Sequence, residues 1–110
     1  MRSNDLEDLI IDKLDNYFNG AVKDYVIKES TDTPFLQLVI EMTLYNYYVV
    51  RVAVEKNTIF FSIVQSGFQL PLFKAPLSEN ELETSPVELD REIRLRIPDK
   101  YLQAKGWQMV

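Results

Sequence analysis

The stretch FLQLVIEMTLYNYYVVRVAVEKNTIFFSIVQ, residues 35–65, decides the fold. Apolar and polar side chains alternate along three parts of it, residues 35–43, 48–55 and 58–65. This period of two is typical of strands that bury one face. Because only short turn-forming segments separate the three parts, the pattern predicts three consecutive antiparallel strands joined by tight hairpins.

The register of both hairpins follows from the same alternation, since a slip of one residue would exchange the buried face and the solvent face. A turn at residues 56–57 and a three-residue loop at 45–47 bring the apolar residues of all three strands onto one face. This predicted inward set is Leu38, Ile40, Met42, Val50, Val52, Val54, Ile59, Phe61 and Ile63. The same loop places Glu41 opposite Arg51 on the other face, so apolar matching and charge matching agree.

An amphipathic helix is predicted before the strands, over residues 4–18. Its apolar side chains recur at steps of three and four residues, and they are Leu6, Leu9, Ile10, Leu14, Tyr17 and Phe18. Asn4 is the expected N-cap, and Asn19 with Gly20 offers a left-handed end. We expect this helix to pack over Val50, Val52 and Val54.

Two further strands flank the three central ones. Residues 21–29 form the first, although apolar residues fall on both of its sides and leave its facing open. Residues 30–34 form the turn that follows it. Residues 68–73 form a short fifth strand, which we expect at an edge of the sheet because Pro71 cannot donate to a ladder.

The C-terminal third is predicted as a loop, a strand and a helix. Residues 74–86 are polar and acidic, and the capping-box spacing of Ser78 and Glu81 predicts one helical turn within this loop. Alternation over residues 87–97 predicts a final strand with one wet face, which begins after Arg91 because that residue interrupts the apolar side of the pattern. Residues 99–105 then make a short helix.

These elements predict an α+β fold, with an N-terminal amphipathic helix packed on one face of an antiparallel, meander-type sheet of about five to six strands and a short C-terminal helix. We interpret residues 1–110 as a single domain, because 110 residues and 12.9 kDa are the common size of one.

Composition excludes several chemistries. The chain has no cysteine and no histidine, which removes thiolate metal sites, disulfides and the nucleophile–histidine pairs of hydrolases. A net charge of −5 disfavours nucleic acid and favours a partner protein with a basic surface. No apolar run is long enough to span a membrane, and we expect a cytoplasmic protein with no membrane partner.

No catalytic residue, metal ligand set or cofactor site is predicted. The row of Asp5, Asp8, Asp12 and Asp15 has the spacing of a solvated helix face and lacks a calcium loop. Arg94 and Arg96 could receive an anion, but pairing with nearby acids is the stronger interpretation.

Protein binding is better supported, and it has three candidate surfaces. The second face of the sheet is half apolar, with Phe35, Val39, Val49, Phe60 and Val64 among its residues. The hairpin tip carries Tyr45 and Tyr47, and the acidic loop carries Glu79, Glu81 and Glu83. Three alternatives could cover the sheet face: the C-terminal segment with Leu102 and Trp107, a second copy of the chain in a homodimer, or a different protein.

The leading functional hypothesis is therefore a non-catalytic protein-binding module, such as a small inhibitor, an immunity-type protein or an adaptor. The first alternative is a small acidic homodimeric protein like a secretion chaperone, which holds an unfolded client segment. The second alternative is an enzyme or a metal-dependent site built on carboxylates.

Overall fold

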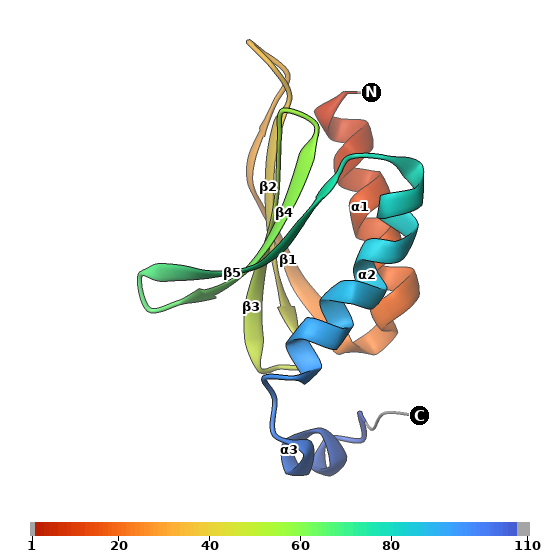
Figure 1. Cartoon of the computed structure of the whole chain (residues 1–110), viewed down its shortest axis with the longest axis vertical. Helices are drawn as coiled ribbons and strands as arrows, with labels where there is room; N and C mark the ends of the chain where they lie inside the picture. Colours follow the sequence, from red (N-terminus) through yellow and green to blue (C-terminus); the bar gives the residue numbers. More distant parts are fainter. Residues whose placement is uncertain (1, 108–110) are drawn as a thin grey trace.

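The structure is a computed structural model that describes residues 2–107. Figure 1 shows an N-terminal helix, five strands and two C-terminal helices. In chain order the elements are α1 (Ser3–Phe18), the 3₁₀ turn η1 (Asn19–Ala21), β1 (Val22–Thr31), β2 (Gln37–Leu44), β3 (Tyr48–Glu55), β4 (Thr58–Gln65), β5 (Phe68–Pro76), α2 (Glu79–Arg94) and α3 (Asp99–Ala104).

The five strands form one antiparallel sheet in the order β1-β2-β3-β4-β5, so the meander is confirmed. The predicted registers of both central hairpins are also confirmed. Val52 lies opposite Ile40 on one side and Phe61 on the other, and Glu41 lies opposite Arg51. The turn residues Lys56 and Asn57 both have positive φ, as a two-residue hairpin of this hand requires.

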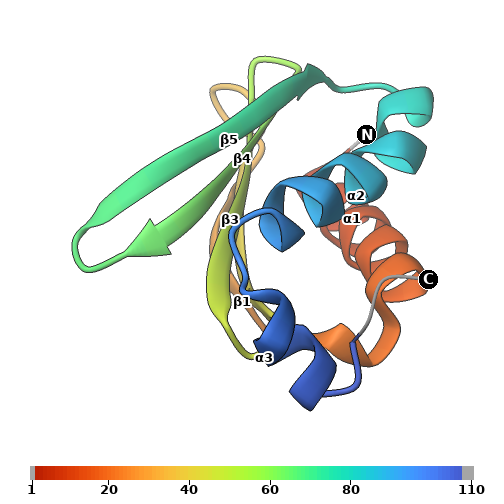
Figure 2. The same cartoon turned by 60° about the horizontal axis from the view of Figure 1, so that its bottom comes forward.

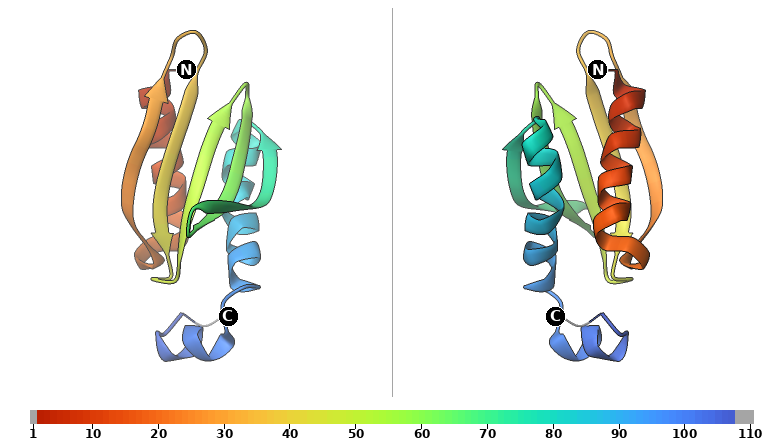
Figure 3. Two further views of the ribbon diagram at one scale, coloured as in Figure 1. Left: turned by 90° about the vertical axis from the view of Figure 1, so that its left-hand side faces the viewer. Right: turned by 90° about the vertical axis from the view of Figure 1, so that its right-hand side faces the viewer.

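Both long helices lie on the same face of the sheet, which we call the inner face (Figures 1 and 3). Val50, Val52 and Val54 are buried there beneath α1 and α2. The helices contribute Leu6, Ile10 and Leu14 from α1 and Leu82, Leu89 and Ile93 from α2. Each such side chain contributes about 1.5–3 kcal/mol when it is fully buried, so this layer holds the fold together.

Helix α1 begins one residue earlier than predicted, and Asn4 is not its N-cap. The first turn is held instead by Asp32, whose Oδ1 accepts a hydrogen bond from the Ser3 amide at 2.8 Å and whose Oδ2 accepts one from the Ser3 hydroxyl at 3.1 Å. These bonds lower the pKa of Asp32 below its usual value. This cap comes from the loop after β1, which is distant in the sequence, so no local sequence pattern predicts it.

The predicted strand over residues 87–97 is wrong, because α2 runs through most of it. Ser78 does cap this helix, and its hydroxyl accepts from the Glu81 amide at 3.2 Å. The helix then continues past Pro86 for two more turns. Of the five apolar residues that suggested alternation, Val87 and Leu95 are 54% and 74% exposed, whereas Leu89, Ile93 and Ile97 are buried in the core.

Strand β5 is longer than predicted, and Pro71 lies inside it, opposite Ser62. Its position at the edge of the sheet is confirmed. A register shift follows Phe61, and the β4–β5 hairpin bends away from the helices beyond that point (Figures 1 and 2). The sheet is therefore concave on the face opposite the helices.

The short helix α3 confirms the prediction for residues 99–105. Leu102 is buried in the helix-side core, and the Trp107 ring packs edge-on against Tyr45 with the ring centroids 5.2 Å apart. Up to residue 107 the C-terminal segment therefore does not cover the second sheet face, which removes one of the three predicted covers. Within residues 2–107, no helix is both long and apolar enough to cross a membrane.

Candidate functional site on the open face of the sheet

The side of the sheet opposite the helices is called the outer face here. It is built by the residues that alternate with the inward-pointing ones, and cross-strand pairing arranges them in rows. The residues of the three central rows are Lys23, Thr43, Val49, Val64 and Gln69; Val26, Glu41, Arg51, Ser62 and Pro71; and Glu29, Val39, Ala53, Phe60 and Lys74.

Large apolar side chains on this face are open to solvent. Phe60 is 40% exposed and Val49 is 38% exposed, while Val39 and Val64 are half-buried between their neighbours. Val26 is also exposed and lies opposite Glu41. Sequence reasoning missed Val26, because a register shift between Lys23 and Val26 changes the phase of the alternation in β1.

An ion pair occupies the centre of the outer face. Glu41 Oε2 accepts hydrogen bonds from Arg51 Nε at 2.9 Å and Nη2 at 2.5 Å. The two side chains are only 16% and 27% exposed, so they lie along the sheet instead of extending into water. The centre of the face is therefore electrically neutral, and a partner could cover it without leaving a charge unpaired.

Neither edge of the sheet suits the addition of another strand. Strand β1 is interrupted by two register shifts, and Asp24 has a φ of 59° within it. Strand β5 contains Pro71 and Pro76 and has its own irregularity. Bulges and prolines are the usual means by which proteins close a sheet edge. Addition of a strand from another chain is therefore disfavoured at both edges.

The concave shape of the outer face comes from the bent β4–β5 hairpin. Figure 3 shows this hairpin standing out from the plane of the other strands toward the viewer of the outer face. Val64 and Gln69 lie on its outer side, and Ser62 donates a hydrogen bond to Gln69 Oε1 at 3.1 Å. The hairpin thus projects on the outer side of the sheet, beside β1 to β3.

The structure places four of the five predicted face residues together: Val39, Val49, Phe60 and Val64. Phe35 is a correction, because it precedes β2 and lies outside the ladder. Its ring lines a hollow with Leu6 and Leu77 at the end of the sheet, and Lys56 Nζ lies 5.8 Å from the ring centroid. The alternation had been extended past the start of the strand.

The hairpin tip differs from the prediction at Tyr45. This residue is only 3% exposed, because a φ of 57° turns its ring back into the helix-side core. It therefore offers no surface to a partner. Tyr47 is exposed, but its ring packs edge-on against Tyr48 and Tyr101, each with a centroid distance of 4.8 Å. The tip is thus mainly a joint between the sheet and α3.

The predicted acidic loop is also corrected. Glu79, Glu81 and Glu83 belong to the first turns of α2, where carboxylates are favoured by the helix dipole. Glu83 forms an ion pair with Lys13 of α1. Arg94 and Arg96 pair with Asp90 and Glu92 one turn earlier in the chain, as the interpretation of these arginines expected.

A buried polar cluster around Asp90 was missed by sequence reasoning. Its carboxylate accepts hydrogen bonds from Tyr17 at 2.9 Å, from Tyr45 at 2.5 Å and from Arg94 Nε at 3.0 Å. Arg94 also donates to the Trp107 carbonyl. Burial and the Asp90 carboxylate raise the pKa of Tyr45 well above its usual value. The cluster joins the ends of α1, α2 and the C-terminal segment, and all its groups are paired with one another, so it has a structural role.

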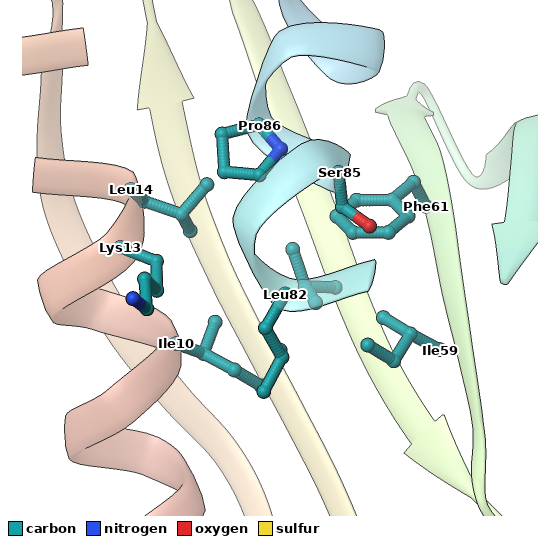
Figure 4. A pocket seen from close by; sticks show the side chains of 9 residues that line it. Ile10, Lys13, Leu14, Ile59, Phe61, Leu82, Ser85 and Pro86 are labelled. Atoms are coloured by element: carbon teal, nitrogen blue, oxygen red, sulfur yellow. The ribbon is translucent and has the colours of Figure 1, made fainter. Parts of the chain in front are cut away.

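A narrow slot lies between α1 and α2 (Figure 4). It is lined by apolar side chains, by Lys13 and by Ser85, whose hydroxyl is buried and has no hydrogen-bond partner. Pro86 lies beside it and has no amide hydrogen, so the usual helical bond to the Leu82 carbonyl cannot form. The free space is about 20 Å³, room for roughly one water molecule. The slot is too small to serve as a ligand site.

Acidic residues do not assemble into a cation site in the part of the chain that the structure describes, where no three of them come close enough to hold a metal ion. Asp15 of the predicted acidic row instead accepts a hydrogen bond from the Tyr25 hydroxyl.

Comparison with protein-family models, curated proteins and solved structures finds no match. The functional conclusion therefore depends on the geometry of the outer face.

Proposed function

We propose that this chain is a non-catalytic protein-binding module whose docking surface is the outer face of the sheet. The strongest support is the uncovered apolar surface of Val39, Val49, Phe60 and Val64 around the neutral Glu41–Arg51 pair. Contiguous apolar patches on folded proteins tend to mark interaction surfaces. A central region without unpaired charge is also what the core of an interface requires.

The rest of the molecule supports this choice by leaving few other surfaces. Helices α1 and α2 occupy the inner face, and both edges of the sheet are closed to strand addition. The β4–β5 hairpin bends toward this side of the sheet (Figure 3). A partner that fits the outer face presents apolar side chains and only a few charges at its rim.

The proposal is tested by comparing glutamate substitutions on the two sides of the molecule. Val39→Glu and Phe60→Glu add charge to the outer face, and Val87→Glu makes the same kind of change on the exposed side of α2. Each variant is immobilised and used to capture proteins from the native cell, and circular dichroism establishes that each is folded.

The expected result is a set of bound proteins that Val87→Glu retains and that both outer-face variants lose. Equal retention by all three variants would exclude the outer face as the docking surface. Loss by Val87→Glu alone would move the site to the acidic helical layer.

A further inference from the structure

The row of residues that crosses the outer face from β1 to β5 is self-complementary. It reads Glu29, Val39, Ala53, Phe60 and Lys74, each paired with the next across the sheet. An anion stands at one edge, a cation at the other and three apolar residues between them. When the row is reversed and laid on itself, each charge meets its opposite.

From this row we infer that the occupant of the outer face is a second copy of the chain, docked face to face about a two-fold axis that runs parallel to the strands through β3. This inference rests on the proposed function, since it uses the same surface. The axis brings β1 of one copy over β5 of the other. Glu29 then faces Lys74 of the second copy, and the same contact is repeated by symmetry.

The sizes of the apolar residues fit the same arrangement. Ala53 is the middle residue of the row and lies on the axis, so it faces Ala53 of the second copy. Its small side chain allows the two sheets to lie close to each other. Phe60, the largest, then faces Val39, which is of medium size. Large residues opposite smaller ones let two sheet faces interdigitate.

The charge distribution also favours a second copy. The ladder residues of the outer face include three cations, Lys23, Arg51 and Lys74, and three anions, Glu29, Glu41 and Glu55. They cancel, although the whole chain carries −5. The excess negative charge therefore lies elsewhere, largely on the helical layer. Two copies that meet through their outer faces therefore avoid the net repulsion that a contact between helical layers would meet. The axis brings Arg51 over Arg51 of the second copy, but each is already paired with its own Glu41, and Glu55 lies in solvent at the end of the strand.

The bent β4–β5 hairpins of the two copies lie on opposite sides of the proposed interface. Because β5 of one copy lies over β1 of the other, each β4–β5 hairpin runs along the β1 edge of its partner. Five strands of about eight residues present a face of roughly 600 Å², from the usual strand spacing and rise. Two faces bury roughly 1,200 Å², which reaches the lower limit for a stable interface.

Charge reversal at the two ends of the row tests the arrangement. Glu29 and Lys74 are exposed, so their replacement does not threaten the fold. Sedimentation equilibrium measures the dimer dissociation constant of the wild type, Glu29→Lys, Lys74→Glu and the double variant. We expect each single variant to dissociate about tenfold more readily, because each places like charges together at two symmetric contacts, and the double variant to recover wild-type affinity.

Two further variants separate this inference from the proposed function. Phe60→Glu should make the protein monomeric, and Val87→Glu should leave the dimer unchanged. A wild type that is monomeric up to roughly 1 mM overturns the inference. A double variant that dissociates as readily as the singles overturns the two-fold arrangement. If the wild type is monomeric but the outer-face variants still lose captured proteins, the proposed function stands with a different occupant. A dimer that Phe60→Glu leaves intact, with capture also unchanged, contradicts both.

Discussion

Arg51 lies directly across from Glu41 on the neighbouring strand and makes two hydrogen bonds to one of its carboxylate oxygens. The pair is largely shielded from water in the middle of the outer face, between rows that carry Val39, Val49, Phe60 and Val64. Removing either partner leaves the other charge without compensation in this setting, whereas removing both leaves no uncompensated charge at the centre of the face.

Arg51→Met should therefore lower the free energy of unfolding by about 1–2 kcal/mol, and Glu41→Met by a similar amount. The double variant should lose clearly less than the sum of the two, and urea denaturation measures all three. Additive losses would show that the pair contributes no coupling energy. Such a result would also weaken the interpretation of the outer face as electrically neutral at its centre.

Ser85→Ala should stabilise the protein by about 1 kcal/mol, because it removes a buried hydroxyl that has no hydrogen-bond partner. Alanine also has the higher helix propensity. Ser78→Ala is the matched control, since it removes the hydroxyl that caps the same helix, and it should cost about 1 kcal/mol. Urea denaturation distinguishes the two serines by sign. A loss of stability in Ser85→Ala would mean that the hydroxyl has a partner, such as a buried water molecule.

Stability should fall as the pH rises above about 10, because burial and nearby carboxylates raise the pKa values of Tyr17, Tyr25 and Tyr45 above the ordinary value of 10.0. Above that pH the unfolded chain releases protons that the folded protein retains, so alkali favours unfolding. Tyr25 and Tyr45 each contribute a slope of up to about 1.4 kcal/mol per pH unit, and the more exposed Tyr17 contributes less because solvent screens it.

Urea denaturation between pH 8 and about pH 11 measures this slope. Tyr45→Phe should be less stable at neutral pH, because it loses its bond to Asp90, but its loss of stability with rising pH should be shallower. Tyr47→Phe, which removes the hydroxyl of an exposed tyrosine outside the Asp90 cluster, is the matched control. Identical slopes in all three proteins would argue against a raised pKa at Tyr45.

Acid should weaken the start of α1. The Ser3 amide and hydroxyl lower the pKa of Asp32, so the stabilising contribution of this cap is present above the usual pKa of 3.8 and is lost as the pH falls through the lower, folded-state value. Asp32→Asn should remove this part of the acid dependence and reduce the hydrogen-exchange protection of the first turn of α1. Unchanged protection in the variant would show that the helix does not depend on this cap.

The two hairpins could be predicted to the residue because both hydrophobic matching and the Glu41–Arg51 pairing select one register. The same local reasoning failed at α2, where the exposed apolar residues Val87 and Leu95 completed an alternating pattern with Leu89, Ile93 and Ile97. Helical spacing of Leu82, Leu89 and Ile93 was the signal that could have found this helix.

Four of the predicted outer-face residues came from that register, and they share the face in the structure. Phe35 failed because a strand boundary, which alternation cannot locate, lies between it and β2. Tyr45 failed because its left-handed backbone conformation sends the ring inward. The Asp90 cluster could not be predicted at all, since its groups come from separate elements that only the tertiary fold brings together.

The irregular edges of the sheet also bear on how this protein behaves when it is abundant. Fibre growth by strand addition needs a regular free edge, and β1 and β5 both lack one. A contact between the outer faces of two copies buries both faces, so neither copy keeps an outer face free to bind a third. In the face-to-face dimer inferred above, crowding many copies together should therefore end at the dimer instead of growing into larger assemblies.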